Sequence, residues 1–108
     1  MVLVQGDQSK IIKISLTDYP DISDANWIGE YTIRDRNVKG EILQQETLGK
    51  EIAGDKFVFF ITAENSAILD VGTTFLAIEI RNMTITPSFR QEVVRELLTI
   101  SDSGVPNV

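Results

Sequence analysis

The chain has 108 residues, close to the commonest size of a single domain and long enough to bury a hydrophobic core. It contains no histidine and no cysteine, so it lacks the commonest general base, the thiol nucleophile and the usual zinc ligands. Sixteen acidic and ten basic residues give a formal charge of −6, with no cluster of Lys and Arg that could bind phosphates. This composition argues against an enzyme, a cofactor-binding protein and a nucleic-acid-binding protein.

Alternating apolar residues predict strands along almost the whole chain. In residues 10–17, for example, Ile12, Ile14 and Leu16 share one face, as in a strand with one buried side. The tract 62–69 breaks this period, and Thr62 as N-cap with Glu64 in the first turn predicts one short helical turn near 63–69. Strands are expected at 2–5, 10–17, 27–34, 41–48, 56–62, 73–82 and 90–100.

The last expected strand has a rival interpretation. Phe89, Val93, Val94 and Leu97 also fit the 3.6-residue period of an amphipathic helix. We favour a strand, because the segment follows a strand and a turn and ends in the β-favouring residues Thr99 and Ile100.

About seven strands with turn signals every 8–12 residues are typical of an all-β sandwich. We expect a single domain over residues 1–100, in which residues 1–8 form an N-terminal arm or short strand, followed by a flexible tail over 101–108. No apolar run approaches the roughly 20 residues of a membrane-spanning helix, so no membrane contact is expected.

Trp27 and Tyr31 are the first candidate binding residues. They share one face of the expected strand 27–34, where two exposed rings could stack on a sugar. A sandwich more often buries such aromatics between its sheets, with a glycine such as Gly29 leaving room for a ring. We therefore prefer the core interpretation for both residues.

The strand 56–62 is unusual because both of its faces are apolar. Phe57, Phe59 and Ile61 alternate with Val58 and Phe60, whereas the outer face of a two-layer sandwich is normally polar. Either the 62–72 segment covers this strand, or Phe57, Phe59 and Phe60 form an exposed interface with another protein. The sequence does not decide between these two interpretations.

Acidic residues suggest two further kinds of site. The loop 18–26, with Asp18, Asp21 and Asp24, could offer oxygen ligands to Ca²⁺, but Asp beside Pro is also ordinary turn chemistry, which we prefer. A second kind of site is the carboxylate pair of a glycosidase, for which Glu79, Glu92 and Glu96 are candidates because their strands could be neighbours. Three arginines are interleaved with them, Arg81, Arg90 and Arg95, and favour solvated ion pairs between strands instead. The sequence therefore predicts no catalytic residue and no metal ligand.

The order of motifs resembles that of small structural proteins of tailed bacteriophages. An early Gly-Asp pair precedes an alternating strand, an Ile-Arg-Asp strand end and a Thr-Ala-Glu-Asn-Ser-Ala-Ile-Leu tract come later, and the chain closes on Leu-Leu-Thr-Ile. The chain is similar in this order to the immunoglobulin-like β-sandwich modules of baseplate, tail-fibre-attachment and head-decoration proteins. The motifs lie at residues 6–7, 11–16, 33–35, 62–69, 71–72, 75–80 and 97–100.

The resemblance implies a non-enzymatic virion protein with an immunoglobulin-like, antiparallel β-sandwich fold. It would act as a head-decoration or cement module, or as a tail or baseplate adaptor, and would bind major capsid or tail proteins. A symmetric homo-oligomer is implied, with a trimer as our preferred state, assembled in the bacterial cytoplasm. The alternative from a different class is a carbohydrate-binding or adhesion module that recognises a cell-surface glycan.

Overall fold

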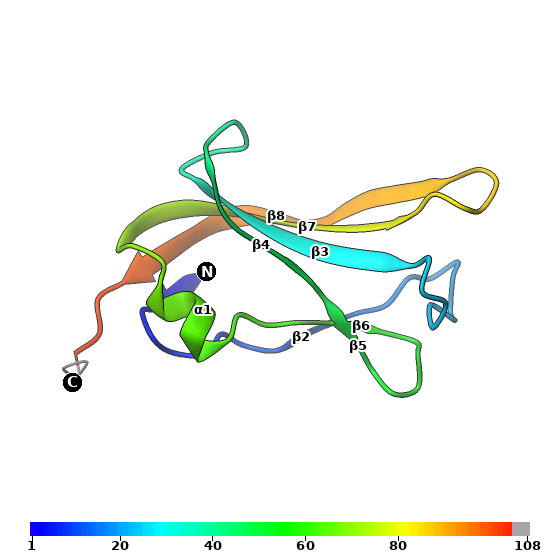
Figure 1. Cartoon of the computed structure of the whole chain (residues 1–108), viewed down its shortest axis with the longest axis horizontal. Helices are drawn as coiled ribbons and strands as arrows, with labels where there is room; N and C mark the ends of the chain where they lie inside the picture. The colour runs from blue at the N-terminus through cyan, green and yellow to red at the C-terminus, as the bar shows by residue number, and fades with distance from the viewer. Residues whose placement is uncertain (105–108) are drawn as a thin grey trace.

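The structure, a computed structural model, describes residues 1–104. It is nearly all β, with a five-stranded sheet packed on a three-stranded sheet and one short helix at the open end between them (Figure 1). The expected all-β sandwich is therefore confirmed. The elements are β1 (Val2–Val4), β2 (Ile12–Ile14), β3 (Ile28–Asp35), β4 (Ile42–Thr47), β5 (Gly49–Lys50), β6 (Phe57–Phe59), α1 (Ala63–Ala67), β7 (Gly72–Asn82) and β8 (Phe89–Ser101).

The strand order is that of an immunoglobulin-like sandwich. The larger sheet runs β1-β8-β7-β3-β4 and the smaller sheet runs β2-β6-β5. With the strands lettered in chain order, and β4 as the extra strand of variable-type domains, these are the extended GFC sheet and the BED sheet. Figure 1 shows the chain crossing from the larger sheet into the smaller one between β4 and β5.

Residues 1–8 were expected to form an arm or a short strand, and they contain a strand rather than a free arm, because Val2–Val4 pairs with β8. Three other expectations about the strands need correction. The pairing of β1 with β8 is parallel, so the larger sheet is mixed rather than antiparallel. The two-residue strand β5 was not predicted, because Gly49 and Lys50 carry no alternating pattern. The last strand continues to Ser101, and the rest of the expected tail lies partly in residues 105–108, outside the described residues.

The alternation in β7 sets the core of the sandwich. Leu76, Ile78 and Ile80 are fully buried, while the residues between them lie on the outer face of the sheet. β8 is a strand, as we preferred, but it contains a β-bulge. Val94 pairs with Ile78 and Glu92 pairs with Glu79, so one residue of β8 has no direct partner.

The strand β6 is the middle strand of the smaller sheet, and this position settles the ambiguity of 56–62. Phe57, Phe59 and Ile61 are fully buried in the core, so Phe57 and Phe59 cannot form an exposed interface. That part of the interface prediction was wrong, because the face of β6 that carries Phe57 and Phe59 meets the larger sheet. Phe60 remains partly exposed and lines a hollow of about 310 Å³ beside Val58.

The helix α1 closes one end of the sandwich, as the sequence predicted for this tract. The hydroxyl oxygen of Thr62 accepts a hydrogen bond from the backbone N–H of Asn65, which caps the helix. Ser66 is fully buried; its hydroxyl accepts a hydrogen bond from Gly6 N–H (2.9 Å) and donates one to Asp7 O (2.7 Å). One side chain therefore ties the helix to the connection between β1 and β2.

Ser66→Ala is expected to lower the free energy of unfolding by about 1–2 kcal/mol, because it leaves two backbone groups of that connection without their partner. Urea unfolding followed by circular dichroism measures the loss. Glu64→Ala, an exposed change in the same helix that keeps these bonds, is the matched control. Equal losses in the two variants would contradict the tie through Ser66.

Among residues 1–104, no helix is long and apolar enough to cross a bilayer. The longest elements are instead β7 and β8, which run together beyond the other strands into a protruding hairpin (Figure 1).

Candidate functional site: the outer face of the five-stranded sheet

Trp27 and Tyr31 lie in the core, as preferred, and neither presents an exposed ring. Their exposed fractions are 6% and 2%. The Trp27 ring packs against Tyr19 and Phe89, with ring centroids 4.8 Å and 5.5 Å away. A sugar-stacking platform on these two rings is therefore wrong, because the faces that would meet a sugar are covered by protein.

The polar end of Tyr31 is satisfied inside the protein. Its hydroxyl donates a hydrogen bond to Gln44 Oε1 (2.6 Å), and Gln44 Nε2 donates to the backbone oxygen of Asn65 (3.0 Å). Burial raises the pKa of the Tyr31 phenol above its ordinary value, so the group stays neutral. This network joins β3, β4 and α1 and has a structural role.

The acidic loop uses its carboxylates to form turns. Asp21 Oδ1 accepts hydrogen bonds from the backbone N–H (3.0 Å) and the hydroxyl (2.7 Å) of Ser23, which lower the pKa of Asp21. Asp24 Oδ1 accepts one from the N–H of Asn26. These are the local bonds of Asx turns. Over residues 1–104, no three acidic side chains gather closely enough to hold a metal ion.

The charged side chains gather instead on the outer face of the larger sheet. Glu30, Glu79 and Glu92 are directly opposite one another on β3, β7 and β8, and Arg81 and Arg90 form the next row. Like charges in direct opposition destabilise a sheet, so the glutamate row needs compensation. We call this group of five residues the charged face.

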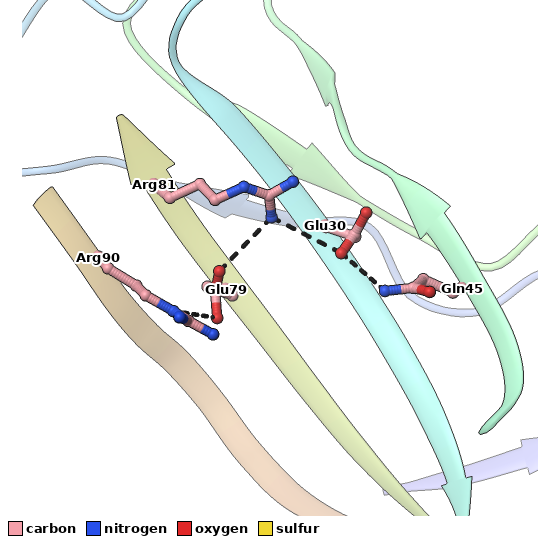
Figure 2. Close-up of polar contacts among 5 residues, drawn as sticks. All are labelled: Glu30, Gln45, Glu79, Arg81 and Arg90. Carbon is pink, nitrogen blue, oxygen red and sulfur yellow. Dashed lines mark hydrogen bonds and ion pairs between the residues drawn. The ribbon is translucent and has the colours of Figure 1, made fainter. Parts of the chain in front are cut away.

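Arginines of the second row supply that compensation for Glu30 and Glu79 (Figure 2). Arg81 Nη1 lies 3.4 Å from Glu79 Oε1 and 3.6 Å from Glu30 Oε1, and so bridges the two carboxylates. Arg90 Nε lies 2.9 Å from the other oxygen of Glu79. Gln45 Nε2 on β4 donates a hydrogen bond to Glu30 Oε1 (2.8 Å). The interpretation of these charges as cross-strand ion pairs is confirmed for Glu79.

The third glutamate considered for acid–base work lies elsewhere. Glu96 pairs with Leu76, a core residue, and therefore lies on the opposite face of the sheet from Glu79 and Glu92. The sequence could not show this, because the bulge in β8 reverses the alternation between residues 92 and 96. The three carboxylates do not converge on one position.

A broad hollow of about 510 Å³ lies over the charged face. Charged and apolar groups share its lining, with Phe75 and Ala77 in β7 between the ion pairs. Arg95 adds a positive group, with its guanidinium 5.9 Å from the ring centroid of Phe75.

Next to the charged face the same side of the sheet is apolar. Phe75 and Leu97 are directly opposite each other, and Val2 pairs with Thr99, the next outward residue of β8. Val2 is 69% exposed and Leu97 is 56% exposed. We call Val2, Phe75 and Leu97 the apolar patch. The sequence does not reveal this patch, because its members come from three strands and only the strand pairing brings them together.

Comparison with known proteins does not add an identity. No protein-family model matches the chain, and no curated protein is significantly similar to it.

Proposed function

We propose that this chain is a non-enzymatic structural protein of a tailed-phage particle, either a head-decoration module or a tail or baseplate adaptor. It binds neighbouring virion proteins through the outer face of its five-stranded sheet. The motif order motivates the phage assignment, and the immunoglobulin-like strand order agrees with the fold that the resemblance implies.

The observation that carries the binding role is the apolar patch beside the charged face. An exposed apolar area with a polar border is typical of protein–protein contact sites, because burying it releases water while the border sets the orientation. Val2 and Leu97 are its most exposed members, and the Glu–Arg rows lie farther along the same face. The open face of a sheet suits the broad surface of a neighbouring subunit better than it suits a small ligand, which is usually enclosed by a pocket.

The glycan-binding alternative has no observation in its favour. It was built on Trp27 and Tyr31, and both rings are buried. We therefore do not pursue it as a second function.

Co-sedimentation tests the proposed function. The purified protein is mixed with tailed-phage particles assembled after deletion of its reading frame from the phage genome that encodes it, and we expect it to sediment with them. Val2→Glu should weaken binding about tenfold or more, because a charge then replaces a buried apolar contact.

Ile52→Glu is the matched control. Ile52 is also an exposed apolar residue, but it lies in the loop between β5 and β6, away from the five-stranded sheet. This variant should bind like the unchanged protein. A chain that never sediments with particles would contradict the virion assignment, and equal binding by the Val2 variant would contradict the role of the apolar patch.

A further inference from the structure

We propose that two copies of this chain pair through the free edge of β8, antiparallel and around a two-fold axis, to form one continuous ten-stranded sheet. The inference names a partner for the proposed function and rests on the idea that the protein works through contacts with other subunits. It depends on three features of β8: an open backbone edge, a bulge, and two charges without an ion-pair partner.

The edge of β8 is only partly covered. β1 pairs with Thr99 to Ser101, and the amino group of Met1 reaches Leu97 O at 3.3 Å. Before that point, residues 89–96 have β7 on one side and, within residues 1–104, no strand on the other. Such an edge offers unpaired N–H and C=O groups to another strand.

The backbone direction along this edge is known from the covered part. Thr99 N–H donates to Met1 O (2.9 Å), and Leu97 O faces the same side. Because these groups alternate along a strand, those of Arg95 also point to the open side. A second strand can therefore pair with residues 91–96, and the ladder ends at Leu97, where Met1 covers the edge.

The bulge puts two opposite charges on the same face of this edge. Glu92 pairs with Glu79, and Arg95 pairs with Ala77; both β7 partners lie on the outer face of the sheet. Residues three apart in a regular strand would point to opposite faces. Here both point outward, because Val93 is the extra residue of the bulge.

This arrangement is self-complementary. When two β8 edges run antiparallel about an axis between Val93 and Val94, Glu92 of each copy is opposite Arg95 of the other. Both residues are exposed, and in the described chain no salt bridge joins either of them to another residue. The same register places Gln91 opposite Glu96 on the other face, where the amide can donate to the carboxylate.

The other edge of the larger sheet does not have this property. β4 contains a single charged residue, Glu46, so a two-fold pairing of β4 gives no complementary charge pair.

The dimer should be weak in solution, because an edge-to-edge pairing buries less area than a standard interface. Light scattering over a range of protein concentrations is expected to show a monomer that becomes a dimer as concentration rises. Glu92→Arg and Arg95→Glu should each weaken dimerisation about tenfold or more, because each change opposes like charges twice across the axis.

Charge exchange provides the decisive control. An equimolar mixture of the Glu92→Arg and Arg95→Glu proteins should dimerise like the unchanged protein, because each chain then meets the opposite charges. The double variant should also recover self-association. Circular dichroism checks that each variant is folded. If the double variant fails to fold, the mixture of the two single variants still tests the pairing.

A strict monomer, a trimer, or a dimer insensitive to both single changes would overturn the inference. Its failure is separable from failure of the proposed function. If the chain binds particles but stays monomeric, the proposed function stands and the β8 pairing is refuted. If it forms a charge-dependent dimer but does not bind particles, the β8 pairing stands and the proposed function is refuted.

Discussion

Phe59→Ala is expected to lower the free energy of unfolding by about 3–5 kcal/mol. Phe59 is fully buried in the middle strand of the smaller sheet, and its ring makes an edge-to-face contact with Tyr31, with centroids 5.5 Å apart. Removing the ring leaves a cavity between the two sheets that the short strands cannot close. Since small domains have only about 5–15 kcal/mol of stability, this variant loses much of it. Urea unfolding followed by the fluorescence of the buried Trp27 measures the change.

Phe60→Ala is the matched control, because it makes the same change at the next residue. Phe60 is 37% exposed, and its loss should cost about 1 kcal/mol or less. The contrast distinguishes the core position of Phe59 from the exposed interface that the sequence also allowed. A larger loss for Phe60 than for Phe59 would show that β6 faces the opposite way.

Gly29→Val should destabilise the fold by about 3 kcal/mol, because it overfills the core. A Cβ atom at Gly29 would lie 2.8 Å from Phe57 Cδ1 and 3.1 Å from Leu48 Cδ1. The Phe57 ring is fully buried, so it has no free space into which it could move. The expected result is a lower midpoint of thermal unfolding, measured by circular dichroism.

Gly49→Val makes the same substitution in β5, where a Cβ would meet no atom within 4 Å. Valine suits a strand, so stability should stay within about 0.5 kcal/mol of the unchanged protein. If the Gly29 variant unfolded at the same temperature as this control, the close approach of β3 and Phe57 would be refuted. From the sequence, Gly29 was expected to leave room for the ring of Trp27. In the structure the ring beside Gly29 is that of Phe57.

Most strands were predictable because alternation is a local signal. In β7 the alternation of Leu76, Ile78 and Ile80 predicts a buried face from the strand's own sequence, whatever strands lie beside it. The structure buries all three residues. The helix was predictable for the same reason, since Thr62 caps a helix of five residues, Ala63–Ala67. β5 was not predicted, because a strand of only two residues is too short to show an alternating pattern.

The candidate site was much less predictable. Glu79 and Arg81 were singled out with their ion-pair interpretation, but Glu30 and Gln45 complete the network from β3 and β4. Their position depends on register between strands that are far apart in sequence, and no single-strand pattern encodes register. Phe57 and Phe59 were ambiguous for a related reason: an apolar strand does not say which of its faces meets the other sheet.

The amino-acid sequence alone determined that this chain is all β, where nearly every strand lies, and which side of most strands is apolar, because side chains alternate along any extended backbone. Only the tertiary structure decided which strands are neighbours, that the first strand joins the last, and that a bulge turns Glu92 and Arg95 to one face. Those features arise from pairing between distant segments, where one extra residue reverses the face of every residue beyond it.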